Sequence, residues 1–414
     1  MKKMVFMAAF VAATAAFVAC SSNDDLVQQK PEISEASEDN VEEKVPMTIV
    51  VSDLTSRGTD FNDTDHPLTA FTLYSNMNAS WVNGKPFTKP NDSWTVDGAD
   101  LSWENGGPFT FYGVSDVTNL TKVTVGTQSV PQTPTVSENT VSFGYTMPQE
   151  LRPKDDPDDE QEADRYWCNS ENLPDLLVSK NTGSSSLNDG KLTVDFTHAL
   201  ARIKEINIYA NTTRLEALET PITDHQMFRF RINGIRLGGL KSVGTYTFGA
   251  TTPWTVSGDD TEFTIPLKQS ELTYAKTWFK PGADKTTGIT LPLTDGGLYL
   301  IPQTAAGEIV GTGSYEVSGA YAELDAQVFV YDNAAYTTLD DIGWYYCCED
   351  FDPQTFKEAD SEQAKFGLIR VPLKFTLAAN NVYILTLDLS RGVYVGGMHD
   401  GEKIFDSVNF DPGT

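Results

Sequence analysis

Apolar and polar residues alternate along most of this chain with the two-residue period of a β-strand. In residues 45–51, Met47 and Ile49 lie on one face, and Thr48 and Val50 lie on the other. Further short apolar or alternating runs are bounded by Gly, Asn, Asp and Pro, and they cover residues 71–74, 109–112, 176–178, 206–208, 228–232, 263–265, 298–300, 322–330 and 383–389. Long helical periodicities are missing from the sequence. This pattern predicts an all-β chain of antiparallel β-sandwiches with Greek-key connections.

The run at residues 322–330 makes a specific prediction about burial. Its alternation places Leu324 and Ala326 inside the protein and leaves Glu323 and Asp325 outside.

A charged loop and a turn-rich stretch mark a domain junction in the middle of the chain. Residues 148–164 form a charged loop with seven closely spaced carboxylates at residues 155–164, and residues 181–190 read NTGSSSLNDG. We therefore expect one sandwich domain over residues 45–185 and a second over residues 186–414. The carboxylates lack the glycine spacing of an EF-hand loop, so we expect a solvated loop there and no metal site.

The N-terminus has the pattern of an export signal. Lys2 and Lys3 precede an apolar run over residues 5–17 that is too short to span a bilayer, and Ala19 directly precedes Cys20. This pattern resembles a bacterial lipoprotein signal, which implies that residues 1–19 are removed and that Cys20 is lipidated. The alternative is an ordinary secretory signal in which Cys20 is incidental. Residues 20–44 are rich in acidic residues and poor in apolar ones, which indicates a tether, so we expect a surface-exposed protein held on the outer membrane by acyl chains.

Composition excludes several functions. The chain has 58 acidic and 30 basic residues and a net charge of −28, which disfavours nucleic acid as a partner. Its four histidines form no paired metal-ligand motif, and no nucleophile elbow, phosphate loop or dinucleotide fingerprint is found. We expect no catalytic residues, no metal and no cofactor, and we do not expect an enzyme. His198 is expected to be a hydrogen-bonded structural residue.

Tryptophans suggest a rival function. They could stack on sugars if the chain were a surface glycan-binding lipoprotein, or they could fill β cores, which is commoner. The tryptophans in question are Trp81, Trp94, Trp103, Trp254, Trp278 and Trp344.

Three cysteines follow Cys20, and their pairing is open. Cys347 and Cys348 could bridge each other, one of them could reach Cys168, or all three thiols could be free.

Several motifs occur in an order that resembles the fimbrillin family. Residues 174–179 (PDLLVS) and 192–203 (LTVDFTHALARI) are similar to the domain junction of that family, residues 298–303 (LYLIPQ) to a later strand, and residues 383–389 (YILTLDL) to a late strand. The spacing of Trp81, Trp94 and Trp103 also resembles the first domain of the family.

The resemblance implies a fold and a mechanism. Fimbrillins have two transthyretin-like β-sandwich domains and are exported as lipoproteins. An arginine-specific protease removes the segment that carries the first strand, and a C-terminal strand of the neighbouring subunit fills the groove. The implied partners are other pilin subunits in a head-to-tail polymer, and the implied role is adhesion to a ligand on a host or bacterial surface.

The resemblance also assigns residues. It implies cleavage between Arg57 and Gly58, so that residues 45–57 are removable, whereas the alternative is a surface arginine in a turn. The donor strand would include Ile404, Val408 and Phe410. The competing interpretation of residues 393–395 and 404–410 is an edge strand or ordered tail, and a tip or anchor subunit would need no donor.

Overall fold

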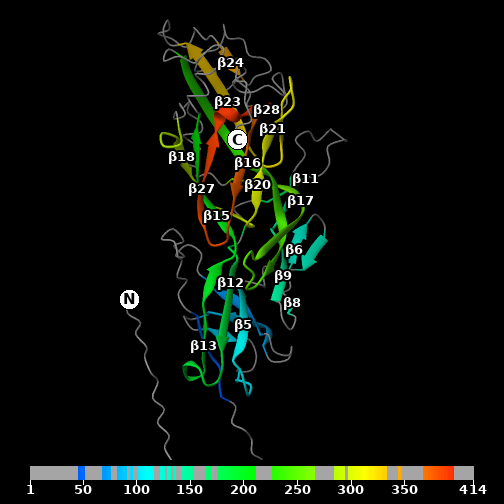
Figure 1. The fold of residues 1–414 in the computed structure, drawn as a ribbon, viewed down its shortest axis with the longest axis vertical. Helices are drawn as coiled ribbons and strands as arrows, with labels where there is room; N and C mark the ends of the chain where they lie inside the picture. Colours follow the sequence, from blue (N-terminus) through cyan, green and yellow to red (C-terminus); the bar gives the residue numbers. More distant parts are fainter. Residues whose placement is uncertain are drawn as a thin grey trace, which may run out of the picture. The chain divides into compact units, whose positions relative to one another are not determined.

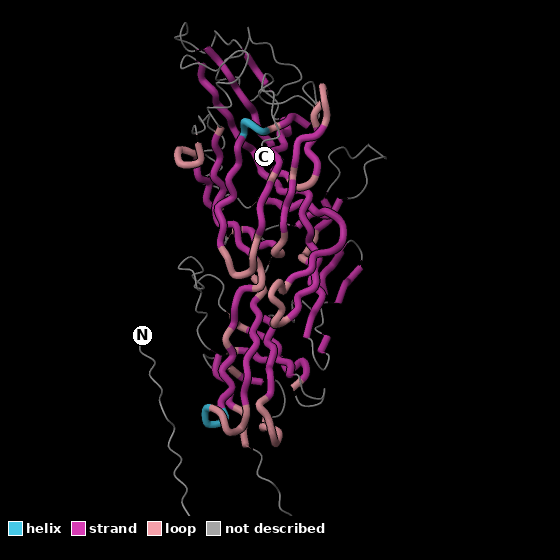
Figure 2. Tube along the Cα trace, in the orientation of Figure 1, coloured by secondary structure: helices cyan, strands magenta, loops and turns pink. Residues whose placement is uncertain are grey.

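The computed structural model describes residues 45–51, 68–75, 82–90, 94–96, 101–115, 122–125, 128–131, 135–136, 141–152, 165–168, 173, 175–210, 226–265, 284–293, 297–332, 344–346 and 367–395. These residues belong to one compact unit, Lys44–Thr414. Strands dominate them, as Figure 2 shows, with two short 3-10 turns, η2 (Asn188–Gly190) and η4 (Leu389–Arg391). No helix in this part of the chain is long and apolar enough to cross a membrane.

The largest sheet has ten strands among the described residues (Figure 1). Its path is β10 (Glu150–Arg152), β11 (Arg165–Cys168), β17 (Trp254–Thr264), β16 (Gln226–Thr247), β23 (Tyr321–Asp332), β25 (Gly367–Pro372) and β28 (Val393–Val395). Strand β24 (Trp344–Tyr346) pairs with β23, and β9 (Val141–Thr146) pairs with both β16 and β8 (Thr135–Val136).

Two sheets of intermediate size accompany it. One follows the order β14 (Phe196–His198), β12 (Leu177–Gly183), β5 (Phe109–Ser115), β2 (Ala70–Ser75), β3 (Asn83–Thr88) and β4 (Thr95–Val96). In the other, β15 (Ala201–Tyr209) pairs with β18 (Ile289–Pro292), β19 (Leu298–Leu300) and β27 (Val382–Asp388).

Four two-stranded sheets complete the described structure. They are β1 (Thr48–Val51) with β13 (Lys191–Val194), β6 (Lys122–Val125) with β7 (Gln128–Pro131), β20 (Thr304–Ala306) with β26 (Lys374–Thr376), and β21 (Glu308–Val310) with β22 (Glu316–Ser318).

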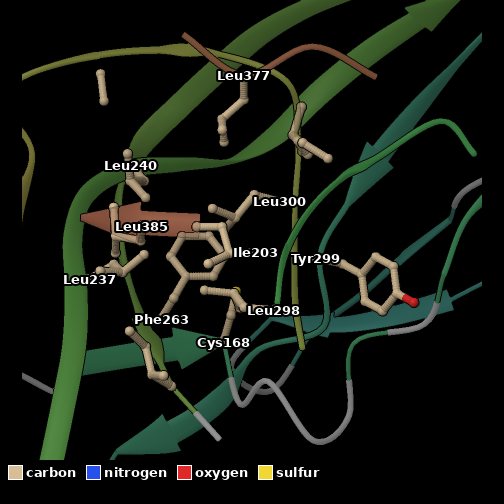
Figure 3. Close-up of a cluster of buried hydrophobic side chains, with 14 of the residues drawn as sticks. Cys168, Ile203, Leu237, Leu240, Phe263, Leu298, Tyr299, Leu300, Leu377 and Leu385 are labelled. Atoms are coloured by element: carbon tan, nitrogen blue, oxygen red, sulfur yellow. The ribbon is translucent and has the colours of Figure 1, made fainter. Parts of the chain in front are cut away.

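The larger core lies between the ten-stranded sheet and the sheet built on β15. Leu237 and Phe263 from the first sheet meet Ile203, Leu300 and Leu385 from the second (Figure 3). Two sheets that pack face to face around an apolar layer form a β-sandwich, so the predicted all-β sandwich class is confirmed.

The smaller core is a second layer of the same kind. Phe71 and Phe111 of the six-stranded sheet pack in one cluster with Met47, which directly precedes β1, and with Leu192 and Val194 of β13. The β1–β13 pair therefore covers the apolar face of the six-stranded sheet.

The described pairs are mostly antiparallel, but β1–β13, β11–β17 and β15–β27 are parallel. Strands of a parallel pair cannot be joined by a tight hairpin, and the members of these three pairs are far apart in the sequence. The predicted antiparallel arrangement holds for the other described pairs, and these three pairs are exceptions to it.

One burial prediction is wrong. Leu324 and Ala326 point into the larger core as expected, but Glu323 is only 3 % exposed. It lies on the opposite face of β23, where its carboxylate accepts hydrogen bonds from Arg236 and from Arg370 Nε, the latter at 2.9 Å. The two guanidinium groups compensate the buried charge and cover it, which an alternation pattern does not reveal.

The two cores do not follow a simple split of the sequence. Leu192 and Phe196, which follow the expected junction, pack in the smaller core, whereas Phe143 and Tyr145, which precede it, pack in the larger one. The division into two domains near residue 185 stays a prediction.

Candidate functional site: the first strand and its two acceptor edges

The first described segment of the chain, residues 45–51, lies between two edges. On one edge β1 pairs in parallel with β13, with Thr48 opposite Lys191 and Val51 opposite Val194. On the other edge Pro46 forms an antiparallel bridge with Ser102. Parts of the chain that are far apart in sequence therefore hold this segment from both sides.

Backbone hydrogen bonds fix the start of the segment. The Met47 N–H donates to the Leu101 carbonyl at 2.8 Å, and the Trp103 N–H donates to the Val45 carbonyl at 2.7 Å. Pro46 stands between these bonds, at a position where no N–H is needed, and proline has none.

The two faces of the segment differ as the sequence predicts. Met47 is 8 % exposed, and Ile49 and Val51 pack against the smaller core. Val50 points the other way and is 41 % exposed, and Thr48 is exposed as well. The predicted two-residue alternation is confirmed over residues 47–51, whereas Val45, expected on the same face as Met47, is 44 % exposed.

Aromatic rings form the floor beneath the segment. The Phe71 ring stacks on that of Phe87 at 4.9 Å between centroids, and it meets Trp94 and Phe196 edge-on at 4.8 and 5.2 Å. These rings come from the six-stranded sheet and from the segment that precedes β4, and they supply apolar surface that β1 covers.

A side-chain hydrogen bond joins the two edges directly. The Trp103 indole Nε1–H donates to the Gly190 carbonyl at 2.8 Å, in a buried position. Trp103 belongs to the edge at residues 101–103, and Gly190 immediately precedes β13. Sequence reasoning missed this contact, since the only signals for it are a tryptophan in one loop and the Asn-Asp-Gly turn of another.

His198, in the junction motif, is a structural residue in this structure. Its Nδ1 lies 2.5 Å from an Asp175 carboxylate oxygen, and both side chains are almost fully buried. Asp175 precedes β12, and His198 pairs with Leu177 of that strand, so the contact between the two side chains links two neighbouring segments. Phe196 and Leu200 of the same motif are buried as well.

Trp94, Trp103 and Trp254 do not form an exposed platform for a sugar. Trp103 and Trp254 are buried, and the indole N–H of Trp254 donates to the Ala199 carbonyl at 2.7 Å. Trp94 is half-buried against Phe71. Trp81, Trp278 and the side chain of Trp344 lie outside the described part of the structure.

Cys168 is a free thiol in the larger core, and burial raises its pKa well above the ordinary value. A buried, protonated thiol is a poor nucleophile. Cys347 and Cys348 lie outside the described residues. The described ranges contain no cluster of three or more His, Cys, Asp or Glu side chains that could hold a metal ion.

The residues that the sequence assigned to processing and exchange lie outside the described ranges. They are Cys20, Arg57, Gly58, Ile404, Val408 and Phe410. Residues 393–395 are described, and they form β28, which pairs with β25 and buries Val393. Residues 393–395 are therefore an ordered strand at the end of the path of the ten-stranded sheet.

No protein-family model matches the sequence, and no curated protein matches it. Several solved structures are similar. A fimbrial protein from Bacteroides vulgatus has a TM-score of 0.41 and 12 % identity, over 83 % of this chain and 95 % of that one. A candidate cell adhesion protein from Bacteroides uniformis has a TM-score of 0.35 and 13 % identity, over 85 % and 96 %.

The fimbrial anchor protein Mfa2 from Porphyromonas gingivalis has a TM-score of 0.28 and 8 % identity, over 81 % of this chain and 99 % of that one. By their names, these three are fimbrial or adhesion proteins. Their TM-scores lie below 0.5, so the fold described above rests on the strands and cores of this chain itself.

Proposed function

We propose that this chain is a fimbrial subunit of the bacterial surface, assembled with other subunits by protease-triggered exchange of its first strand. The observation that carries the proposal is the position of residues 45–51. They lie at the N-terminal end of the described chain, between two edges that are both formed by later segments. A strand in this position can be removed by one cut without breaking any other strand.

Removal of the strand would leave a slot between residues 101–103 and β13, and this slot requires a new occupant. The Leu101 carbonyl and the backbone N–H of Trp103 would lose the hydrogen bonds to residues 47 and 45, and β13 would lose its backbone pairing with β1. The side chains of Leu192 and Val194 would lose the cover of Met47. Unpaired backbone groups and exposed apolar surface are both unfavourable, and an added strand satisfies them together.

The other parts of the mechanism come from the resemblance to fimbrillins. Lipidated Cys20 holds the precursor on the outer membrane, and cleavage after Arg57 frees residues 45–57. A segment around Ile404, Val408 and Phe410 of a second copy then fills the slot. Contacts of this head-to-tail kind do not close, so they build a filament. Its role is adhesion to a host or bacterial surface ligand.

The test is to incubate the purified precursor with a trypsin-like protease and to follow its size. We expect polymers from the wild-type chain and none from Arg57→Ala. A chain truncated after Val395 keeps β28 and removes the proposed donor, so it should be cleaved and remain monomeric.

Each other outcome has a definite meaning. Polymers of the Arg57→Ala chain would refute the switch. Polymers of the truncated chain would refute the donor assignment alone. A wild-type chain that is cleaved and stays monomeric would favour a tip or anchor role over a stalk role.

A further inference from the structure

The bond between Trp103 and Gly190 connects the two edges of the slot without involving the strand between them. The indole N–H reaches the Gly190 carbonyl at 2.8 Å, while the backbone N–H of Trp103 donates to Val45. One residue therefore holds both the strand and the far edge. The bond from the Trp103 indole to Gly190 involves no atom of the strand, so it can form when the strand is absent.

The six-stranded sheet and its surroundings fix the orientation of the Trp103 ring. The ring meets Phe111 edge-on, with 5.7 Å between centroids, and Trp103 is only 2 % exposed. Gly183 makes room for it, because a Cβ atom there would lie 2.7 Å from the indole Cη2. Contacts with β5 and β12 thus aim the indole N–H at the opposite edge.

The opposite edge is also held by its own contacts. The Gly190 N–H donates to the Leu187 carbonyl at 3.1 Å, and the Leu187 N–H donates to the Ser184 carbonyl at 3.1 Å. Gly190 has a φ of +74°, a conformation that favours glycine. A Cβ atom at Gly190 would lie 3.4 Å from Val45 Cγ1, so this turn borders the slot directly.

We propose that Trp103 is a positioning residue that keeps the slot at the width of one strand when residues 45–51 leave. An incoming strand then binds to edges that are already placed. The chemistry of the slot defines this occupant as an extended peptide with apolar side chains at alternate positions. The first inward side chain of this peptide takes the buried place of Met47. The peptide residue at the position of Pro46 donates no hydrogen bond, so proline is tolerated there.

This inference deepens the proposed function, and its test is independent of natural cleavage. In the chain, residues 53–57 are replaced by the recognition sequence of a site-specific viral protease. After the cut, release of the strand is read by mass. A fluorescent synthetic peptide with the sequence of residues 45–57 is then titrated, and its anisotropy gives the affinity of the slot.

Two tryptophan variants form a matched pair. Trp103→Phe removes the bond across the slot, whereas Trp254→Phe removes the equivalent indole bond to the Ala199 carbonyl in the larger core. We expect Trp103→Phe to weaken peptide binding about five- to tenfold, the usual effect of one buried hydrogen bond. Trp254→Phe should leave peptide binding within about twofold of wild type, because Trp254 and Ala199 belong to the larger core, whereas the first strand packs on the smaller one.

Circular dichroism shows whether each variant folds. If Trp103→Phe does not fold, Trp103 is replaced by benzothienylalanine, which keeps the bicyclic shape and lacks the N–H. If the cut strand stays bound, excess peptide is added and its exchange is timed. Slower incorporation by the Trp103 variant than by the Trp254 variant is then the expected result.

Three results would overturn the inference. They are unchanged peptide binding in the Trp103 variant, equal weakening in both variants, and a wild-type chain that releases its strand but binds no peptide. A chain that binds the peptide as expected and never polymerises would overturn the proposed function and leave the role of Trp103 standing.

Discussion

Truncation of the inward side chain of the first strand should loosen that strand while the rest of the protein stays folded. The change is Met47→Ala. Met47 is 8 % exposed and belongs to the smaller core, whereas the larger core contains no residue of this segment. The destabilisation should therefore appear as a local opening of residues 45–51.

The magnitude follows from the atoms that are lost. Methionine is larger than alanine by three heavy atoms, and each buried methylene-sized group contributes ~0.8 kcal/mol. The substitution should cost about 2 kcal/mol, near the lower end of large-to-small changes in cores, because the site lies at an edge where neighbours can relax. Since ~1.4 kcal/mol is a factor of ten, the open population should rise about thirtyfold.

Native-state hydrogen exchange measures this opening. The Met47 amide, which donates to Leu101, and the amides of β1 should exchange about thirtyfold faster in Met47→Ala. Amides of β16 and β23 should be unchanged. The control is Val50→Ala on the same strand, which removes a side chain that is 41 % exposed and should change exchange by about twofold or less.

Two outcomes would refute the reasoning. Unchanged exchange over residues 47–51 would mean that Met47 does not hold the strand. Equal acceleration throughout the chain would mean that the strand opens only with global unfolding, and then a single cut could not free it.

Further predictions concern the cores. Gly183→Ala should lower the free energy of unfolding by about 1–3 kcal/mol in urea titrations, since its Cβ would meet the Trp103 ring, and Gly144→Ala, with open space around its Cβ, should cost less than about 1 kcal/mol. Glu323→Gln should lower the midpoint of thermal unfolding by several degrees, because two guanidinium groups lose their charged partner. Burial is the main cause that raises the pKa of Tyr145, and Cys168 and Asp175 raise it further, so the folded state resists ionisation of this phenol. The contribution of Tyr145 to stability is therefore retained below about pH 10, the pKa in the unfolded chain, and stability falls above that pH by up to ~1.4 kcal/mol per pH unit. When unfolding is followed from pH 8 to 11, this slope should be smaller in Tyr145→Phe.

Local patterns predicted the strands of this protein because successive side chains of a strand point to opposite faces, and apolar and polar residues therefore alternate in its sequence. Leu385 and Leu387 are buried and Thr386 is exposed, as their alternation indicates. The faces of Met47 and Val50 were predicted in the same way. Each of these predictions needs only residues within one strand.

Pairings between distant segments could not be predicted in this way. Nothing near Thr48 in the sequence indicates that Lys191 is its neighbour or that the two strands run in parallel. The burial of Glu323 depends on arginines from two other strands, and the bond from Trp103 depends on the turn at Gly190. These features arise from tertiary contacts, which a single sequence does not encode locally.

The pairing of β1 with β13 has a consequence for the order in which the protein folds. The two strands are separated by about 140 residues, so the edge that completes the place of β1 is synthesised long after β1 itself. During that interval the segment lacks one of its two edges, and closing so long a loop makes its full docking a late step. The six-stranded sheet also needs β12 and β14, which flank β13 in the sequence. A nascent chain that stops before β13 should therefore keep its first strand accessible to proteases and to other strands, however well its earlier hairpins have formed.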